Sequence, residues 1–208
     1  MKYDYLKGKA ISFEGGEGSG KSTIIKLLSE YLEQNSSLKI VQTREPGGSK
    51  IAEQIREVIV DKNNKEMSYE TEALLYAAAR AQLLNEKVFP WLEQDKTIIF
   101  DRYVDSSYVY QGCCRGLGLD KVIEINEFAT KSWLPYKTFI LDLDPKIGFE
   151  RIYSNNRETN RLDEEGMEFH YNVRKYYLEL AKKFPERIIV INANQSPEKI
   201  LEEVLTYL

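Results

Sequence analysis

Residues 10–22 read AISFEGGEGSGKS, a short apolar run followed by a glycine-rich turn that ends in Lys21 and Ser22. From residue 15 onward the letters fit G-x-x-x-x-G-K-S/T, in which glycines let successive backbone N–H groups turn inward toward phosphate oxygens. A strand-like run precedes the pattern and an amphipathic helix pattern follows it, which is the context that such a loop requires. We therefore predict a phosphate-binding loop. Its predicted cofactor-binding residues are Gly15, Gly16, Glu17, Gly18, Ser19, Gly20, Lys21 and Ser22.

Three residues in and beyond this loop point to a nucleoside triphosphate with Mg²⁺. Lys21 is expected to reach the β- and γ-phosphates of ATP, and the Ser22 hydroxyl to ligate Mg²⁺. Asp101 ends a later apolar run, and ligands of a parallel sheet bind at the carboxyl ends of its strands. Asp101 is therefore expected to act on the same Mg²⁺, through water. The alternative is that Asp101 and Arg102 form a local ion pair that closes the end of a strand.

Four further apolar runs follow the first one, with helical patterns between them. Buried strands of a parallel sheet read as continuous apolar runs, and the alternation of strands with helices places helices on both faces of the sheet. The 208 residues suit one α/β domain that spans residues 1–208. The predicted strands are Ala10–Phe13, Ile40–Thr43, Thr97–Phe100, Thr138–Leu143 and Ile188–Ile191.

The overall composition argues against several classes of partner. A formal net charge of −4 disfavours sequence-independent binding of nucleic acid, which needs a basic face. No apolar stretch approaches the roughly 20 residues that cross a bilayer, and the N-terminal residues lack the apolar segment of a secretory signal. Cys113 and Cys114 are adjacent, and neighbours in sequence seldom form a disulfide. We therefore expect a reduced, cytoplasmic protein that binds neither nucleic acid nor a membrane.

The stretch Glu72–Val88 predicts a helix that is apolar almost all the way round. Such a helix is buried within its own domain or against a partner subunit, and the sequence leaves both possibilities open. Arg80 follows Tyr76 by four residues, so both side chains project from the same face of this helix. A charged side chain in such a helix needs a partner.

Residues 154–166 read SNNRETNRLDEEG and show no hydrophobic period. The segment is either a solvated loop or a lid that closes over a site, because loops of this length are often functional. The phosphate-binding loop alone does not identify the reaction. A GTPase should carry an Asn-Lys-x-Asp motif for guanine, which the sequence lacks. A motor ATPase usually carries further domains, for which this length leaves no room.

Three more stretches follow the loop: TREPGGS at residues 43–49, DRY at residues 101–103 and YQG at residues 110–112. With these motifs the sequence resembles the bacterial thymidylate kinases, a family of phosphate-loop nucleoside monophosphate kinases, over essentially its whole length. The stretch TREPGG is highly specific, whereas the loop alone is not. The resemblance implies a five-stranded parallel sheet flanked by helices, a homodimer, a short mobile lid, and transfer of the γ-phosphoryl group of ATP to dTMP, giving dTDP and ADP.

The resemblance also implies how dTMP is held. Glu45 would lie near the sugar and the phosphates, and Arg56 and Arg102 would grip the dTMP phosphate. Arginine suits this task because its planar guanidinium group binds phosphate with two parallel hydrogen bonds.

For the thymine base, the resemblance implies a second group of residues. Tyr76 would lie on the ring, at a position where the family more usually has phenylalanine, so its hydroxyl needs a partner. Arg80 would reach a base oxygen on the same side, and Ser107 and Gln111 would complete the pocket for base and sugar.

In this family the arginine that assists transfer comes from the phosphate loop or from the lid. The third loop position here is Glu17, whose negative charge would repel ATP unless a cation meets it. The lid is therefore expected to supply the arginine, and Arg157 and Arg161 are available there. The predicted catalytic residues are Lys21, Arg102, Arg157, Arg161 and Glu17.

Such a reaction needs no general base, because the acceptor phosphate oxygen is already ionised at neutral pH. It needs two phosphates held in line with their repulsion cancelled. One alternative is a deoxynucleoside kinase, whose acceptor is a sugar hydroxyl, so that Glu14 or Glu45 would have to act as a base; comparing thymidine with dTMP separates the two. The other alternative is a nucleotide-binding regulatory module, which would not release ADP rapidly when dTMP is added.

Overall fold

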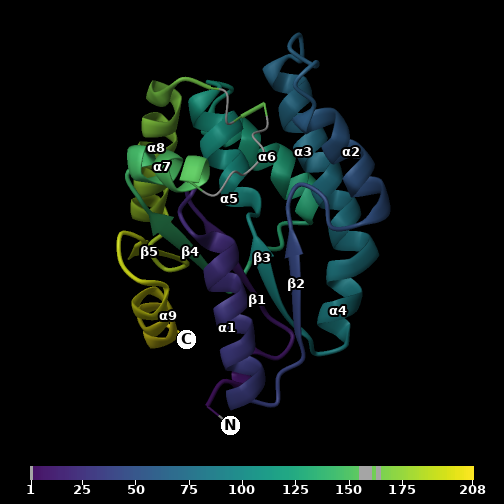
Figure 1. Ribbon diagram of the computed structural model, residues 1–208. Helices are drawn as coiled ribbons and strands as arrows, with labels where there is room; N and C mark the ends of the chain where they lie inside the picture. The colour runs from purple at the N-terminus through teal and green to yellow at the C-terminus, as the bar shows by residue number, and fades with distance from the viewer. Residues whose placement is uncertain (1, 155–160, 163–164) are drawn as a thin grey trace.

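The computed structural model describes residues 2–154, 161–162 and 165–208 (Figure 1). A five-stranded parallel sheet has the strand order β2-β3-β1-β4-β5, so β1 lies at its centre. In the register, Phe13 of β1 pairs with Asp101 of β3 and with Phe139 of β4. The predicted parallel sheet is confirmed. Its strands are β1 (Ala10–Glu14), β2 (Ile40–Arg44), β3 (Thr97–Asp101), β4 (Lys137–Asp142) and β5 (Ile188–Asn192).

Helices cover both faces of the sheet (Figure 1). Two segments, η2 (Leu84–Val88) and η3 (Tyr108–Cys114), are π-helical, and a short 3₁₀ turn, η1 (Asp4–Leu6), precedes β1. No helix in the described part of the chain has both the length and the apolar character that a membrane span requires. The α-helices are α1 (Lys21–Asn35), α2 (Lys50–Val60), α3 (Tyr69–Leu83), α4 (Phe89–Glu93), α5 (Val104–Ser107), α6 (Leu119–Thr130), α7 (Pro145–Ser154), α8 (Met167–Lys183) and α9 (Pro197–Thr206).

Successive residues of the central strands point into two separate cores. Ile98 and Phe100 of β3 pack with residues of α3, η2, η3, α6 and α8, whereas Ile99 packs with residues of α1 and α9. This alternation is the period of two that a strand imposes on its side chains. Because both faces are apolar, the strands read in the sequence as uninterrupted apolar runs.

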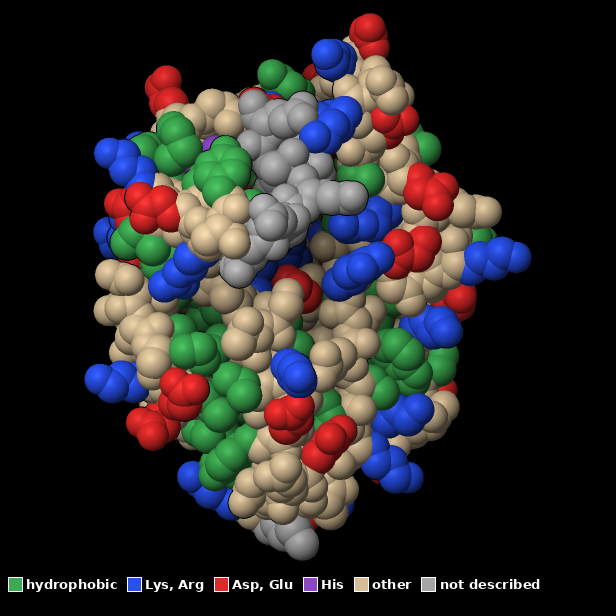
Figure 2. All heavy atoms as spheres, viewed as in Figure 1, with side chains coloured by type: hydrophobic (Ala, Val, Ile, Leu, Met, Phe, Trp, Pro, Cys, Tyr) green, Lys and Arg blue, Asp and Glu red, His purple; other side chains and the backbone are tan. Residues whose placement is uncertain are grey.

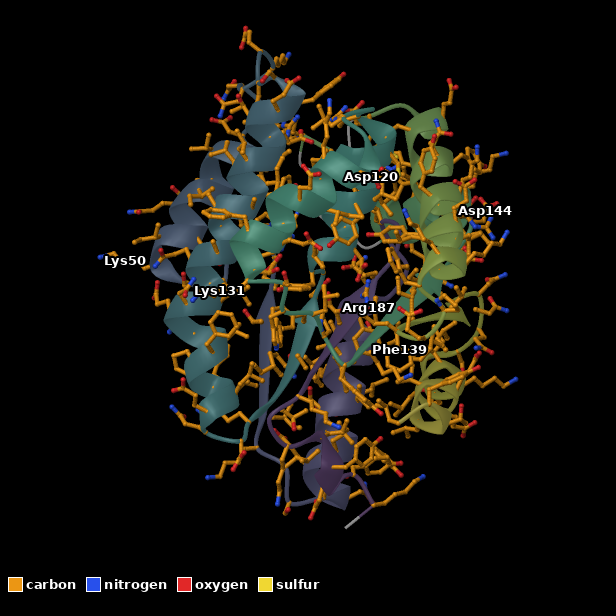
Figure 3. The ribbon with its side chains drawn as sticks, turned by 180° about the vertical axis from the view of Figure 1, so that it is seen from behind. Lys50, Asp120, Lys131, Phe139, Asp144 and Arg187 are labelled. Carbon is orange, nitrogen blue, oxygen red and sulfur yellow. The ribbon has the colours of Figure 1, made fainter. Side chains whose placement is uncertain are left out.

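A buried ion pair fixes α5 to the middle of the sheet. Arg187, seen from behind in Figure 3, donates to both oxygens of the fully buried Asp105 at 2.6 and 2.8 Å. Arg187 also donates to the Thr138 hydroxyl of β4 at 2.9 Å, and Thr138 shares a hydrogen bond with Ser12 of β1 at 2.7 Å. Both charges are therefore satisfied, as buried charges must be. The residues just before α5, at the carboxyl end of β3, are positioned by this contact.

The apolar helix expected at Glu72–Val88 starts three residues earlier, because Ser68 caps α3 through a hydrogen bond from the Thr71 N–H. Its last turns are π-helical rather than α-helical. Arg80 is buried in this helix and has the partner that its burial requires, since its Nε donates to Glu45 at 2.6 Å. The helix packs inside the domain against α2 and α6.

Candidate functional site

A cleft of about 650 Å³ lies at the carboxyl ends of the strands, around the phosphate-binding loop. Figure 2 shows basic side chains gathered around a hollow on this face of the molecule. Besides the loop and residues that follow β2 and β3, the lining includes two groups that come from opposite sides of the central strand β1. The first group, which we call the α2–α3 end, comprises Arg56, Val60, Tyr76, Arg80, Tyr110 and Gln111. The second group, the α7–α9 end, comprises Thr23, Ile24, Arg151, Ile152, Gln195, Pro197 and Ile200.

The loop sits between β1 and α1, as the sequence predicts, and Lys21 folds over it. The Lys21 ammonium donates to the carbonyl oxygens of Gly15 and Gly16 at 3.2 and 3.0 Å. Burial lowers the pKa of Lys21 to about 8, and the nearby Arg102 acts in the same direction. A bound polyphosphate would supply the negative charge that this ammonium lacks, so the loop is built to receive an anion at the N-terminus of α1.

The loop packs directly on the first turn of α7. A Cβ atom added to Gly18 would lie 2.1 Å from the Gly148 carbonyl oxygen, and one added to Gly148 would lie 2.2 Å from the Glu17 carbonyl oxygen. Gly18 also has a φ of +69°, which glycine adopts without steric strain. Two glycines thus let the two backbones touch. Because α7 leads into residues 154–166, the same helix carries both the contact with the loop and the start of the predicted lid.

Ser22 and Asp101, the two predicted metal ligands, lie side by side. The Ser22 hydroxyl donates to Asp101 Oδ2 at 3.0 Å, from the first turn of α1 to the end of β3. A hydroxyl and a carboxylate are oxygen donors of the type that Mg²⁺ prefers. The described residues include no group of three or more His, Cys, Asp or Glu side chains that could hold a metal ion. None is required, because protein-bound Mg²⁺ usually takes one or two carboxylates and completes its shell with phosphates and water.

Arg102 stands next to the loop with a φ of +68°, which is uncommon outside glycine. Its Nη2 donates to Glu17 Oε1 at 2.5 Å, and its Nη1 donates to the hydroxyls of Ser106 and Tyr177 at 3.3 Å each. From the sequence we expect an arginine of the lid to meet the negative charge of Glu17. In the structure Arg102 pairs with Glu17, and it thereby links the loop to the end of β3.

Glu14 is fully buried behind Arg102 and is not part of the cleft lining. Its Oε1 accepts from the Tyr103 N–H at 2.7 Å, and its Oε2 accepts from Ser106 and Tyr177 at 2.6 and 2.8 Å. Burial raises the pKa of this carboxyl, and Asp105 raises it further. With both oxygens engaged, Glu14 is a structural anchor and does not fit the role of a base.

Glu45, the residue after β2, lines the cleft beside the α2–α3 end and pairs with Arg80. Burial raises the pKa of Glu45 to about 7, against the opposing effect of Arg80. Arg80 Nη1 donates to Ser107 Oγ at 3.2 Å and also to Asn126 Oδ1. Glu45 lines the cleft, and its Oε1 is buried without a hydrogen-bond partner among the described residues. Ser107 does not line the cleft but lies behind Arg80, whereas its neighbour Ser106 does line it.

Of the other predicted site residues, Arg56 and Tyr76 line the cleft, whereas Arg161 does not. Arg56 lines the cleft and donates to the Pro46 carbonyl oxygen at 3.0 Å, and burial lowers its pKa. Tyr76 lines the cleft as well, and burial raises the pKa of its hydroxyl to about 12. Arg161 is not at the phosphate loop: it donates to the Ile59 carbonyl oxygen at 3.1 Å and to Glu72 of α3. Arg157 lies outside the described residues.

Several lining residues carried no clear signal in the sequence. At the α7–α9 end, Arg151 donates to the Ala193 carbonyl oxygen at 3.4 Å, Gln195 lies on the loop between β5 and α9, and Pro197 begins α9. Tyr110 lines the opposite end, with the Arg102 guanidinium 5.5 Å from its ring centroid. Its place in the YQG stretch at residues 110–112 was the only available hint.

Comparison with known proteins gives one consistent result. The family described as thymidylate kinase matches residues 13–204. A thymidylate kinase of Clostridium novyi is 50% identical over 97% of this chain and 98% of its own length. One from Anoxybacillus flavithermus is 51% identical over 93% of this chain and 92% of its own length. Among solved structures, thymidylate kinase from Ehrlichia chaffeensis superposes with a TM-score of 0.77 at 31% identity, covering 96% of this chain and 97% of the other.

Proposed function

Because this chain belongs to the thymidylate kinase family, and therefore transfers the γ-phosphoryl group of ATP to dTMP, we propose that the two ends of its cleft separate the two substrates. In this proposal dTMP occupies the α2–α3 end and ATP occupies the α7–α9 end. The observation that carries it is the position of the phosphate-binding loop between two differently lined groups of residues. The phosphates of both nucleotides would then meet at the loop.

The α2–α3 end has the chemistry that a nucleoside monophosphate requires. Arg56 and Arg102 supply guanidinium groups for the phosphate, and the ring of Tyr76 supplies a flat surface for a base. Glu45 offers an unpaired carboxylate oxygen, which suits a hydroxyl or N–H donor of the ligand. Arg80 is held by Glu45 and Asn126, so it contributes a fixed positive charge beneath the ligand.

The site supports phosphoryl transfer by positioning and electrostatics. Lys21 and Arg102 bring positive charge to the place where the triphosphate of ATP and the phosphate of dTMP would meet. A deoxynucleoside kinase would need a base, and Glu14 does not fit that role because both of its oxygens are engaged in the interior. The acceptor of a monophosphate kinase is already ionised, which agrees with this arrangement.

We propose that Ser22 and Asp101 hold Mg²⁺, Asp101 through a water molecule, because their oxygens are adjacent and of the right type. When bound, Mg²⁺ would neutralise charge on the donor phosphates. The lid remains our proposed source of a further arginine. Arg161 donates to Glu72 and does not line the cleft, so Arg157 is the stronger candidate for contact with the phosphates.

Replacing Arg102 with lysine tests the division of the cleft. Arg102→Lys keeps the charge and loses the two-pronged grip on phosphate, so dTMP binding should weaken by roughly 1–3 kcal/mol while ATP binding changes less. Titration calorimetry with each nucleotide alone measures both affinities. Arg174→Lys is the matched control, because Arg174 pairs with Asp142 at the surface and does not line the cleft. A loss confined to ATP would place Arg102 on the donor side and reverse the assignment.

We also propose that the chain forms a homodimer through α2, α3 and α6. These helices pack on one another and carry large apolar side chains that are exposed in the single chain, Leu74 at 56% and Phe128 at 91%. Large apolar side chains exposed on neighbouring helices are the kind of surface that a subunit interface covers. Phe128→Asp should convert a dimer of the 24.2 kDa chain into monomers, measured by sedimentation velocity. Tyr207→Asp, at the end of α9, should leave the mass unchanged, and a monomeric wild type would refute the proposal.

A further inference from the structure

Glu72 is a buried carboxylate that does not line the cleft. It lies in the first turn of α3, with 1% of its surface exposed, and side chains from two other parts of the chain converge on it. Gln111 Nε2 donates to Glu72 Oε1 at 2.9 Å, and Arg115 Nε approaches the same oxygen at 3.5 Å. Arg161 donates to Glu72 Oε2. Three donors from η3, from the residue that follows it and from the lid segment therefore share one carboxylate.

These partners determine which way the Gln111 amide faces. Arg115 and Arg161 can only donate hydrogen bonds, so Glu72 must act as an acceptor toward both. An acceptor carboxylate takes the amino group of a glutamine amide and repels its carbonyl oxygen. Gln111 is 1% exposed and also lines the α2–α3 end of the cleft. With its amino group held on Glu72, the carbonyl oxygen is the part of this amide that is left for a ligand.

We propose that Glu72 is a positioning residue that sets base specificity, by holding Gln111 so that its carbonyl oxygen accepts a hydrogen bond from the base. The inference rests on the proposed function, in which the base of dTMP lies at the α2–α3 end. Thymine and uracil carry an N–H donor at N3. Cytosine has a bare nitrogen acceptor at the same position, which would face the Gln111 carbonyl oxygen without a hydrogen. A fixed acceptor therefore favours thymine and rejects cytosine.

The charge on Glu72 is what makes this orientation firm. A neutral amide at position 72 could either accept from or donate to Gln111, so the Gln111 amide would turn to suit whichever base is bound. The two arginines stabilise the charged form of Glu72 in an interior where a lone carboxylate would be costly. Arg161, from the predicted lid segment, therefore binds the same carboxylate as Gln111.

The test is the variant Glu72→Gln, which keeps the size of the side chain and removes its charge. We expect the ratio of kcat/KM for dTMP over that for dCMP to fall about tenfold, the equivalent of one good hydrogen bond. The ratio of dTMP to dUMP should not change, since both bases carry N3–H. Calorimetric titration with dTMP and dCMP, without a donor nucleotide, should show the same loss of discrimination in Kd.

Two controls separate base reading from lid docking and from general damage. Arg161→Ala removes the contact between Arg161 and Glu72 but leaves the contact between Gln111 and Glu72, so it should alter kcat and retain the dTMP to dCMP ratio. Glu70→Gln makes the same chemical change at an exposed position two residues earlier on α3, and should alter neither kcat nor the dTMP to dCMP ratio. A ratio that falls equally in Arg161→Ala would mean that lid closure, and not Glu72, controls the choice of base.

A double-mutant cycle tests whether Glu72 acts on the base through Gln111, even if Glu72→Gln proves less stable than the wild type. Gln111→Leu should lower the dTMP to dCMP ratio by itself, and adding Glu72→Gln to it should lower the ratio no further. Additive losses would show that Glu72 acts independently of Gln111 and would overturn the inference. A wild type that prefers dTMP while Glu72→Gln keeps the full ratio also overturns it, and leaves the proposed function intact. A wild type that does not bind dTMP at this end would refute the proposed function itself.

Discussion

Replacing Lys21 with alanine should lower kcat by roughly 10²–10³, the loss typical of removing one preorganised charge-stabilising donor. Lys21 is buried, and its ammonium donates to the Gly15 and Gly16 carbonyl oxygens. Its lowered pKa, about 8, means that folding disfavours the charged ammonium. Removing the side chain should therefore leave the melting temperature nearly unchanged.

Single-turnover kinetics with saturating ATP and dTMP, together with thermal unfolding, measure the two effects of Lys21→Ala. Lys26→Ala is the control, because Lys26 lies on the same helix with 74% of its side chain exposed and should be silent. The wild type should also bind ATP more weakly as the pH rises above about 8, since the free enzyme then loses the Lys21 charge. Near-normal turnover in Lys21→Ala, or an unfolded variant, would contradict the assignment of this lysine.

The sheet could be predicted because each buried strand is a continuous apolar run in the sequence. Residues of β3 face apolar surroundings on both sides, so Thr97–Phe100 reads as a strand without any knowledge of its neighbours. The strand ends were less readable. We ended the first strand at Phe13, whereas β1 continues to Glu14, a buried carboxylate whose hydrogen bonds come from positions 103, 106 and 177. No local pattern could reveal partners that distant.

Some features of the site could likewise be predicted from the sequence, and others could not. The phosphate-binding loop and its neighbours Ser22 and Asp101 were readable, because loop geometry and strand topology fix their positions. Contacts between side chains were not readable. Arg161 and Glu72 meet across 89 positions, and nothing near either residue signals this. Ser106 lines the cleft whereas the predicted Ser107 lies behind Arg80, because helical phase decides which of two adjacent serines faces the cleft.

The contact between the phosphate-binding loop and α7 leads to the second large effect. Gly148→Ala should lower kcat by about 10²-fold and raise the KM for ATP, because its methyl group would lie 2.2 Å from the Glu17 carbonyl oxygen. The obstructing atom belongs to backbone and cannot rotate away, so the loop or α7 must shift. A displacement of about 1 Å in groups that align two reactants is enough for such a loss. The fold should lose about 1–3 kcal/mol of stability, as overpacked sites do.

Steady-state kinetics below the melting transition, with dTMP affinity measured separately by calorimetry, distinguish a displaced loop from a damaged fold. The Gly148→Ala change lies on the donor side of the loop, so the Kd for dTMP should stay within about twofold of the wild-type value. A change of that size is typical of a neutral surface substitution. Lys146→Ala is the control, because Lys146 is exposed on the same turn of α7. Since α7 also carries the start of the lid, the shift should disturb loop and lid together. Unchanged kcat and ATP KM in Gly148→Ala would mean that the loop tolerates the displacement, and that its alignment does not depend on α7.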